Sequence, residues 1–144
     1  MIVLDASVAA KWLLPEAGSQ EAVALQEGPD ELFGPDLIRM EVAAAITRRV
    51  RDKEKPLPAA EAIHRCTKWF RLLDQATIAL LPESELLEEA IRLSVKIPHT
   101  LQDCLYLAAA VRLDASLITA DRPFHDRVKP FYKKISMLPG CEKN

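Results

Sequence analysis

Four acidic side chains stand where this sequence would be expected to carry apolar residues. Asp5 ends an apolar run that begins at Met1, and Asp121 follows a second apolar run. Glu41 and Asp103 lie inside segments rich in Leu, Ile, Val and Ala. Burying a carboxylate is costly unless it is paired, hydrogen-bonded or bound to a metal. The four acids therefore predict one divalent-cation site that the fold assembles.

The chemistry expected of such a site is that of Mg²⁺ or Mn²⁺. Carboxylate oxygens are hard ligands, whereas zinc sites usually include His or Cys. Mg²⁺ keeps several of its waters and binds through a few carboxylates together with substrate phosphate. Phosphodiester hydrolysis suits this arrangement, because the ion activates water and offsets negative charge on the phosphate.

Each acid also has an ordinary structural explanation. Asp is a common first residue of helices, so Asp5 and Asp121 could be helix caps, and Pro123 supports a helix start after Asp121. An arginine partner could neutralise Glu41 or Asp103 instead. The occurrence of all four in one short chain favours the metal site.

Three nearby polar residues are candidates for supporting roles. Ser7 follows Asp5 by two positions, and Thr119 precedes Asp121 by two. Their hydroxyls could orient the carboxylates or bound water, while a helix-start hydroxyl and a strand residue are the ordinary alternatives. His99 precedes Asp103 by four residues, and a helix-start or surface position is expected for it. The sequence offers neither a Ser/His/Asp triad nor a glycine-rich phosphate loop.

Apolar periodicity and breaker residues indicate the elements that must position these groups. Strands are expected at 1–5, 32–34, 77–81, 115–119 and 134–138, and helices at 6–14, 19–26, 35–53, 59–73, 84–95 and from Thr100 to Val111. The first, third and fourth strands should be buried and the last should lie at an edge. This alternation predicts a three-layer α/β/α sandwich around a short, mostly parallel sheet. Ligands of such sheets bind beyond the carboxyl ends of the strands, where Asp5 and Asp121 lie.

Length and composition predict one domain over residues 1–144 and exclude several protein classes. No apolar run is long enough to span a membrane and the start does not resemble a signal peptide, so a cytoplasmic protein is expected. Three widely spaced cysteines favour reduced, packing thiols over disulfides or zinc. The net charge is −2, but residues 48–55 and 122–134 are basic. Either basic segment could meet nucleic acid, although a solvated helix face is the simpler interpretation.

Four segments of the chain, in order, resemble the PIN domain ribonucleases, and in particular the VapC-like toxins of toxin–antitoxin pairs. The matching segments are Ile2-Val3-Leu4-Asp5-Ala6-Ser7-Val8 with Lys11-Trp12, Pro35-Asp36-Leu37 leading to Glu41-Val42-Ala43, Leu101-Gln102-Asp103-Cys104-Leu105-Tyr106-Leu107-Ala108, and Leu117-Ile118-Thr119-Ala120-Asp121 with Phe124. Each motif is weak alone, and the four in order are strong.

The resemblance implies an endoribonuclease that depends on Mg²⁺ or Mn²⁺, with an RNA substrate. By position, Asp5, Glu41, Asp103 and Asp121 would be the acidic metal-binding and catalytic set, with Ser7 and Thr119 as supporting hydroxyls. It also implies a homodimer and a small antitoxin protein that occupies an apolar groove. Trp12 and the pair Trp69-Phe70 are candidate antitoxin contacts, although core packing is the expected role of each.

Two departures from the family pattern bear on rate or substrate choice. Ala44 stands where many relatives have Asn, and Pro123 stiffens the segment after Asp121.

Other functions fit the sequence less well. A haloacid-dehalogenase-like phosphatase would have a second Asp at position 7, where this chain has Ser7, and a receiver-like domain would have an Asp after the strand at 77–81. A PIN-like scaffold that binds RNA or protein without cutting is the remaining alternative.

Overall fold

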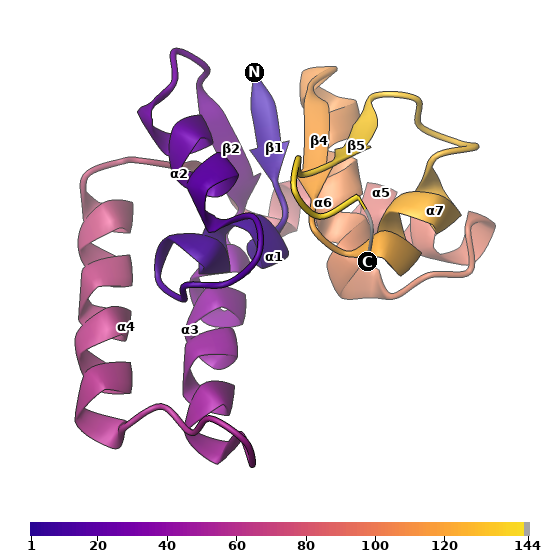
Figure 1. Cartoon of the computed structure of the whole chain (residues 1–144). Helices are drawn as coiled ribbons and strands as arrows, with labels where there is room; N and C mark the ends of the chain where they lie inside the picture. Colours follow the sequence, from indigo (N-terminus) through magenta and orange to yellow (C-terminus); the bar gives the residue numbers. More distant parts are fainter. Residues whose placement is uncertain (143–144) are drawn as a thin grey trace.

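The structure is a computed structural model that describes residues 1–142, and its centre is a sheet of five short strands (Figure 1). The strands are β1 (Ile2–Leu4), β2 (Leu32–Pro35), β3 (Ala79–Leu81), β4 (Ser116–Thr119) and β5 (Ile135–Met137). Their order is β3-β2-β1-β4-β5, and each neighbouring pair is parallel. The predicted sheet is confirmed and is parallel throughout. The predicted single domain over 1–144 includes residues 143 and 144, which lie outside the described residues.

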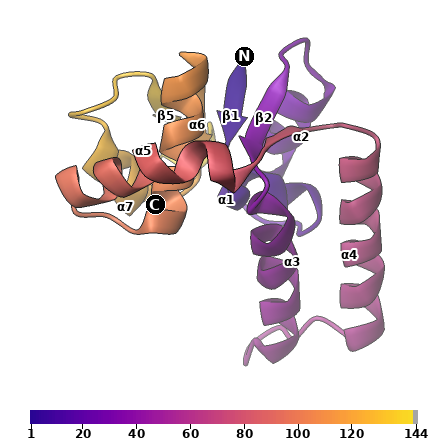
Figure 2. The same ribbon diagram turned by 180° about the vertical axis from the view of Figure 1, so that it is seen from behind.

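Helices cover both faces of this sheet, as predicted for a three-layer α/β/α sandwich. They are α1 (Ala6–Ala9), α2 (Ser19–Glu27), α3 (Ile38–Arg48), α4 (Ala59–Asp74), α5 (Glu83–Lys96), α6 (Leu101–Leu113) and α7 (Arg122–Val128), with 3₁₀ turns η1 (Ala10–Trp12) and η2 (Arg49–Arg51). The views in Figures 1 and 2 place α5 and α6 on one face and α1, α2 and α7 on the other. Helices α3 and α4 pack side by side and project beyond the carboxyl ends of the strands.

The core explains why an acid on α6 or after β1 is unusual. Val3 and Leu4 of the central strand are fully buried, and residues 104–110 of α6 are all buried. Helix α6 packs on β1, β2 and β4 with α5 on its other side, so it is apolar nearly all the way round. A polar group at its first turn is therefore placed at the rim of the core.

Three predicted elements differ from the structure. The helix expected at 6–14 is regular only to Ala9 and tightens into η1, because the Trp12 indole donates to the Ala22 carbonyl and turns the chain toward α2. The helix expected at 35–53 begins at Ile38, because Pro35 is the last residue of β2 and pairs with Leu81. Its end is η2 rather than regular helix.

The strand expected at 77–81 is shorter and lies at an edge instead of in the buried centre. It begins at Ala79, which is exposed, and pairs only with β2. Apolar content does not distinguish an edge strand from a central one, since strand order is a tertiary property. The last strand lies at the opposite edge, as predicted.

Two further expectations can be compared with residues 1–142. Within that range no helix is both long and apolar enough to cross a membrane. All three cysteines are free: Cys104 and Cys141 are buried in the core, and Cys66 packs against it. Their predicted packing role agrees with this placement.

Candidate functional site

The four predicted acids line a single cavity of about 470 Å³ at the carboxyl ends of the strands. Asp5 follows β1 and Asp121 follows β4, which is the strand paired with β1. Glu41 comes from the first turn of α3, and Asp103 from the first turn of α6. Residues far apart in sequence thus meet because two parallel strands end together and two helices start beside them.

Asp5 is held by two hydroxyl groups from different segments. Ser7 and Thr119 each donate to its Oδ2 atom, both at 2.7 Å. The Ser7 hydroxyl accepts the backbone N–H of Ala120, and the Thr119 hydroxyl accepts that of Asp121, both at 3.0 Å. Because each backbone donor occupies a lone pair, the two hydroxyl protons are directed at Asp5. Asp5 occupies the N-cap position of α1, but its side chain makes no capping hydrogen bond to that helix.

Burial and neighbouring charge act on Asp5 in the same direction. Its side chain is buried, and this desolvation raises its pKa from 3.8 to about 7. The hydrogen bonds from Ser7 and Thr119 lower the pKa in part, while the negative charges of Asp103 and Glu41 raise it further. The carboxylates are therefore close enough to repel one another, a repulsion that a bound cation would relieve.

Glu41 is fixed by a tyrosine that the sequence did not single out. The Tyr106 hydroxyl donates to Glu41 Oε1 at 2.6 Å and joins α6 to α3. Burial raises the pKa of Glu41, the Tyr106 hydrogen bond lowers it, Asp103 raises it and Arg48 lowers it. Burial and the carboxylates of Asp5 and Glu41 raise the pKa of Tyr106, so its phenol stays protonated and donates. The available signal was a tyrosine within an otherwise apolar helix, because a buried phenol needs a partner.

The side chain of His99 does not lie at the surface, which was one of the positions expected for it. It does precede α6, but its side chain is only 15% exposed and its Nε2 lies 2.7 Å from Asp103 Oδ2. Its ring stacks on Phe124 of α7, with centroids 5.2 Å apart and planes at 16°. Thr100 caps α6 as predicted by accepting the Asp103 backbone N–H at 3.3 Å. His99 therefore holds the Asp103 carboxylate from outside the cavity lining.

Asp121 has the capping role that its sequence position allowed, and it also lines the cavity. Its Oδ1 atom accepts the backbone N–H of Phe124 at 3.1 Å, which starts α7 with Pro123 in the first turn. The two roles are compatible, because a carboxylate has a second oxygen.

The side chains around the cavity that could bind a metal ion fit Mg²⁺ or Mn²⁺ better than zinc. The acids supply only oxygen atoms, and the wall between them is made of small apolar side chains, among them Ala6, Ala10, Ala44 and Ala45. Within residues 1–142 no three His, Cys, Asp or Glu side chains converge tightly enough to form a preformed metal site. Mg²⁺ does not require one, since it retains waters and binds through one or two carboxylates plus phosphate oxygens.

Comparison with known proteins shows the family to which this chain belongs. Residues 2–129 match the family described as PIN domain. The chain belongs to the PIN domain family. All four acids lie within the matched residues.

One curated relative and two solved structures are similar to this chain over most of its length. Ribonuclease VapC3 of Pyrobaculum aerophilum is 28% identical over 127 residues, which are 88% of this chain and 93% of the relative. A toxin–antitoxin complex from Klebsiella pneumoniae contains a chain with a TM-score of 0.67 and 17% identity, covering 94% of this chain and 96% of that one. VapC20 of Mycobacterium tuberculosis, described as a toxin that cleaves the sarcin–ricin loop, has a TM-score of 0.64 and 14% identity, over 86% and 92%. The two structures support the PIN fold.

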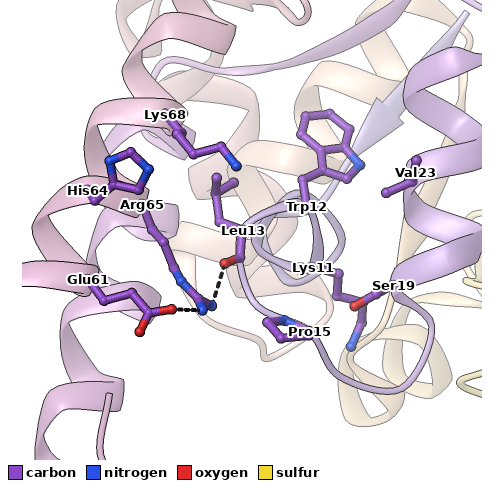
Figure 3. Close-up of a pocket in the computed structure, with 10 residues that line it drawn as sticks. All are labelled: Lys11, Trp12, Leu13, Pro15, Ser19, Val23, Glu61, His64, Arg65 and Lys68. Atoms are coloured by element: carbon purple, nitrogen blue, oxygen red, sulfur yellow. Dashed lines mark hydrogen bonds and ion pairs between the residues drawn. The ribbon is translucent and has the colours of Figure 1, made fainter. Parts of the chain in front are cut away.

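A second cavity of this PIN domain, of about 410 Å³, lies between the loop after α1 and one face of α4 (Figure 3). Trp12 lies on the loop side, and Lys68 lies opposite it on α4. Arg65 crosses between the two sides, because it donates to the Leu13 carbonyl at 2.9 Å and pairs with Glu61. The loop side of the cavity carries the apolar Trp12 and Leu13 together with Lys11, and the helix side carries Lys68 beside the paired Arg65 and Glu61.

The aromatic residues expected in the core have different environments. Trp69 is fully buried, and its indole donates to the Arg39 carbonyl at 3.0 Å, so core packing is confirmed for it. Trp12 is half-buried against Trp69, with ring centroids 6.4 Å apart, and lines the second cavity. Phe70 is 48% exposed, so the expected core role is wrong for Phe70.

Proposed function

We propose that this protein is a divalent-metal-dependent endoribonuclease and the toxin of a toxin–antitoxin pair. The observation that carries the proposal is the placement of all four acids of a PIN domain around one cavity. The similarity to Ribonuclease VapC3 supports RNA as the substrate.

Asp5, Glu41, Asp103 and Asp121 would hold the Mg²⁺ or Mn²⁺ ion. When bound, the ion lowers the pKa of a coordinated water and offsets charge on the phosphate. Hydrolysis adds the water oxygen to phosphorus and breaks one phosphorus–oxygen bond of the RNA backbone. The protein's part is to fix the carboxylates, with Ser7 and Thr119 on Asp5 and Tyr106 on Glu41.

RNA cleavage by matched variants tests the proposal. We expect the wild-type protein to cleave single-stranded RNA with Mg²⁺ or Mn²⁺ and to stop when EDTA is added. Asp5→Ala and Asp103→Ala should each reduce the rate by roughly a hundredfold or more, because each removes a proposed ligand. Asp30→Ala, which alters an exposed acid in a loop outside the cavity, is the control.

Persistent cleavage by both cavity variants would overturn the assignment of these acids. Failure of the wild-type protein to cleave with either ion, while it still binds RNA, would favour a binding scaffold instead.

We infer that the antitoxin binds at the cavity of Figure 3. Trp12 and Leu13 offer an apolar surface, and the exposed Lys68 offers positive charge beside it. A segment with an apolar side chain flanked by acidic residues would complement both. The similar fold of a chain from a toxin–antitoxin complex supports a partner of this class.

We also infer a homodimer through α5. Leu87, Ile91 and Val95 follow one another at intervals of four and are 41%, 48% and 77% exposed. That spacing places them in one stripe on the helix, on a different side from the buried Leu86 and Ala90. A contiguous exposed apolar stripe of this kind indicates a protein contact.

A further inference from the structure

The cavity that holds the acids continues into a neighbouring one. A cavity of about 480 Å³ adjoins it, and the two share Ser7, Ala10, Ala45 and Arg48 in their linings. Three of these four shared residues have small side chains, and Arg48 is the long one. A ligand bound at the carboxylates can therefore extend past Arg48 into the adjoining cavity.

Among the basic residues at this junction, Arg48 is the one that forms no ion pair with a carboxylate within residues 1–142. Two other basic residues line the adjoining cavity, and both face carboxylates: Lys11 lies 3.1 Å from Glu16, and Arg49 lies 3.7 Å from Glu16. Within residues 1–142, Arg48 forms neither an ion pair nor a hydrogen bond, and its side chain is exposed. Its five guanidinium N–H groups are thus available to a ligand.

The direction of Arg48 is indicated by its effect on the acid cavity. Arg48 follows Glu41 by seven residues on α3, which places both on the same side of the helix two turns apart. Its positive charge lowers the pKa of Glu41. Between them, Ala44 and Ala45 line the acid cavity and leave the path open.

Arg49 adds an independent observation in the adjoining cavity. Its Nε atom is buried and has no hydrogen-bond partner in residues 1–142, and the nearest ion-pair oxygen, on Asp52, is 3.9 Å away. A buried donor without a partner costs free energy that an acceptor would recover. The Arg49 guanidinium group, which also faces Glu16 and Asp52, therefore has one donor without a partner, whereas Arg48 beside it has all of its donors unused.

We propose that Arg48 and Arg49 form a subsite for an RNA phosphate that flanks the one to be cleaved. This inference rests on the proposed function, because the scissile phosphate is what places RNA at the carboxylates. A phosphate is the matching ligand, since its oxygens accept the parallel hydrogen bonds of a guanidinium group. The subsite also offsets the repulsion between the acidic cavity and a polyanionic strand.

Kinetics with Mn²⁺ and a mixed-sequence, fluorescein-labelled single-stranded RNA test the subsite. We expect Arg48→Ala to raise KM about tenfold with kcat near the wild-type value, because a charged hydrogen bond to bound RNA is lost in both ground and transition states. Arg48→Lys should recover part of the loss, since it keeps the charge without the planar fork. Arg51→Ala is the matched control, because Arg51 is also exposed and basic but lines neither cavity.

Binding separates this inference from the proposed function. In the Asp103→Ala background, fluorescence anisotropy with the same RNA and Mn²⁺ should show an approximately tenfold weaker Kd for Arg48→Ala. The slope of log K against log salt should fall by about 0.7, as expected for one phosphate contact on a single strand. Absence of RNA cleavage by wild-type protein, with this binding difference intact, would overturn the nuclease and support the subsite.

Three results would overturn the subsite. They are a KM and Kd for Arg48→Ala that match the wild type, an equal loss in Arg51→Ala, or no measurable RNA binding by protein with Arg48 intact. An equal loss in both variants would mean that the basic segment acts only through diffuse charge.

Discussion

At the scale of single residues, side chains fix three of the four cavity carboxylates by hydrogen bonds. Ser7 and Thr119 donate to Asp5, Tyr106 donates to Glu41, and the His99 ring lies within hydrogen-bond distance of Asp103. Such contacts fix the rotamers of the acids, so that little reorganisation is needed when a cation binds. The arrangement also buries negative charge and therefore opposes folding in the absence of a cation.

Asp5→Asn should stabilise the cation-free protein above neutral pH. The pKa of Asp5 is about 7 in the folded chain and 3.8 when unfolded. Between these values the folded protein holds a proton that the unfolded chain has released, so the free energy of unfolding falls as pH rises from about 4 to about 7. Asn cannot ionise and escapes this loss, which is on the order of a few kcal/mol.

Urea unfolding in EDTA at pH 5 and pH 8 measures this difference. The gain of Asp5→Asn over the wild type should be larger at pH 8, and Asp30→Asn should show no such gain. Equal effects at the two pH values would contradict the assigned pKa.

At the scale of elements, the site depends on how α6 and α3 are joined. Tyr106 lies one turn after Asp103 on α6 and reaches Glu41 on α3, so one phenol links two helices that each carry a cavity acid. Its hydrogen bond to a charged group in a buried setting is of the stronger kind, about 1.5–3 kcal/mol. The same bond orients Glu41 toward the cavity.

Tyr106→Phe should therefore reduce both stability and activity. We expect a loss of about 1.5–3 kcal/mol in the free energy of unfolding and about a tenfold lower kcat, because Glu41 loses its orienting donor. Tyr132→Phe is a matched control: the Tyr132 hydroxyl donates to the Ala110 and Ala115 carbonyls, outside the acid cavity. It should lower stability and leave kcat unchanged. A comparable fall in kcat for both variants would indicate a general structural effect.

At the scale of the whole molecule, several exposed apolar side chains lie on α5 and on α4, besides those on other elements. On α5 they are the stripe of Leu87, Ile91 and Val95, and on α4 they are Ile63 and Phe70. Their helices lie on different sides of the molecule (Figures 1 and 2). The proposed dimer through α5 would leave the second cavity beside α4 free for the proposed antitoxin.

Ile91→Glu should convert a dimer into a monomer. A charge in the middle of the α5 stripe cannot be buried without a partner, so self-association is lost while the fold is kept. Analytical ultracentrifugation of the wild type, Ile91→Glu and Ile63→Glu measures the effect, and the α4 variant should remain dimeric. Dissociation by Ile63→Glu alone would move the interface to α4, and a monomeric wild-type protein would refute the dimer.

The sequence by itself determined the fold class and the members of the acid set. Apolar runs that end in Asp5 and Asp121 indicate strands whose carboxyl ends carry polar groups, and acids within apolar helices are informative because their burial is costly. These signals are local. The acid set was therefore predicted correctly although the start of the helix that carries Glu41 was placed at Pro35 instead of Ile38. The roles of the acids in catalysis remain predictions.

Only the tertiary structure decided what surrounds each acid. Strand order made β3 an edge, paired β1 with β4, and so brought the Thr119 hydroxyl to Asp5 across 114 positions. The contact of Tyr106 with Glu41 spans 65 positions and joins two helices. Such contacts follow from the packing of whole elements, which local periodicity does not encode. For the same reason, Arg48 looked like part of a solvated basic face until the fold placed it between two cavities.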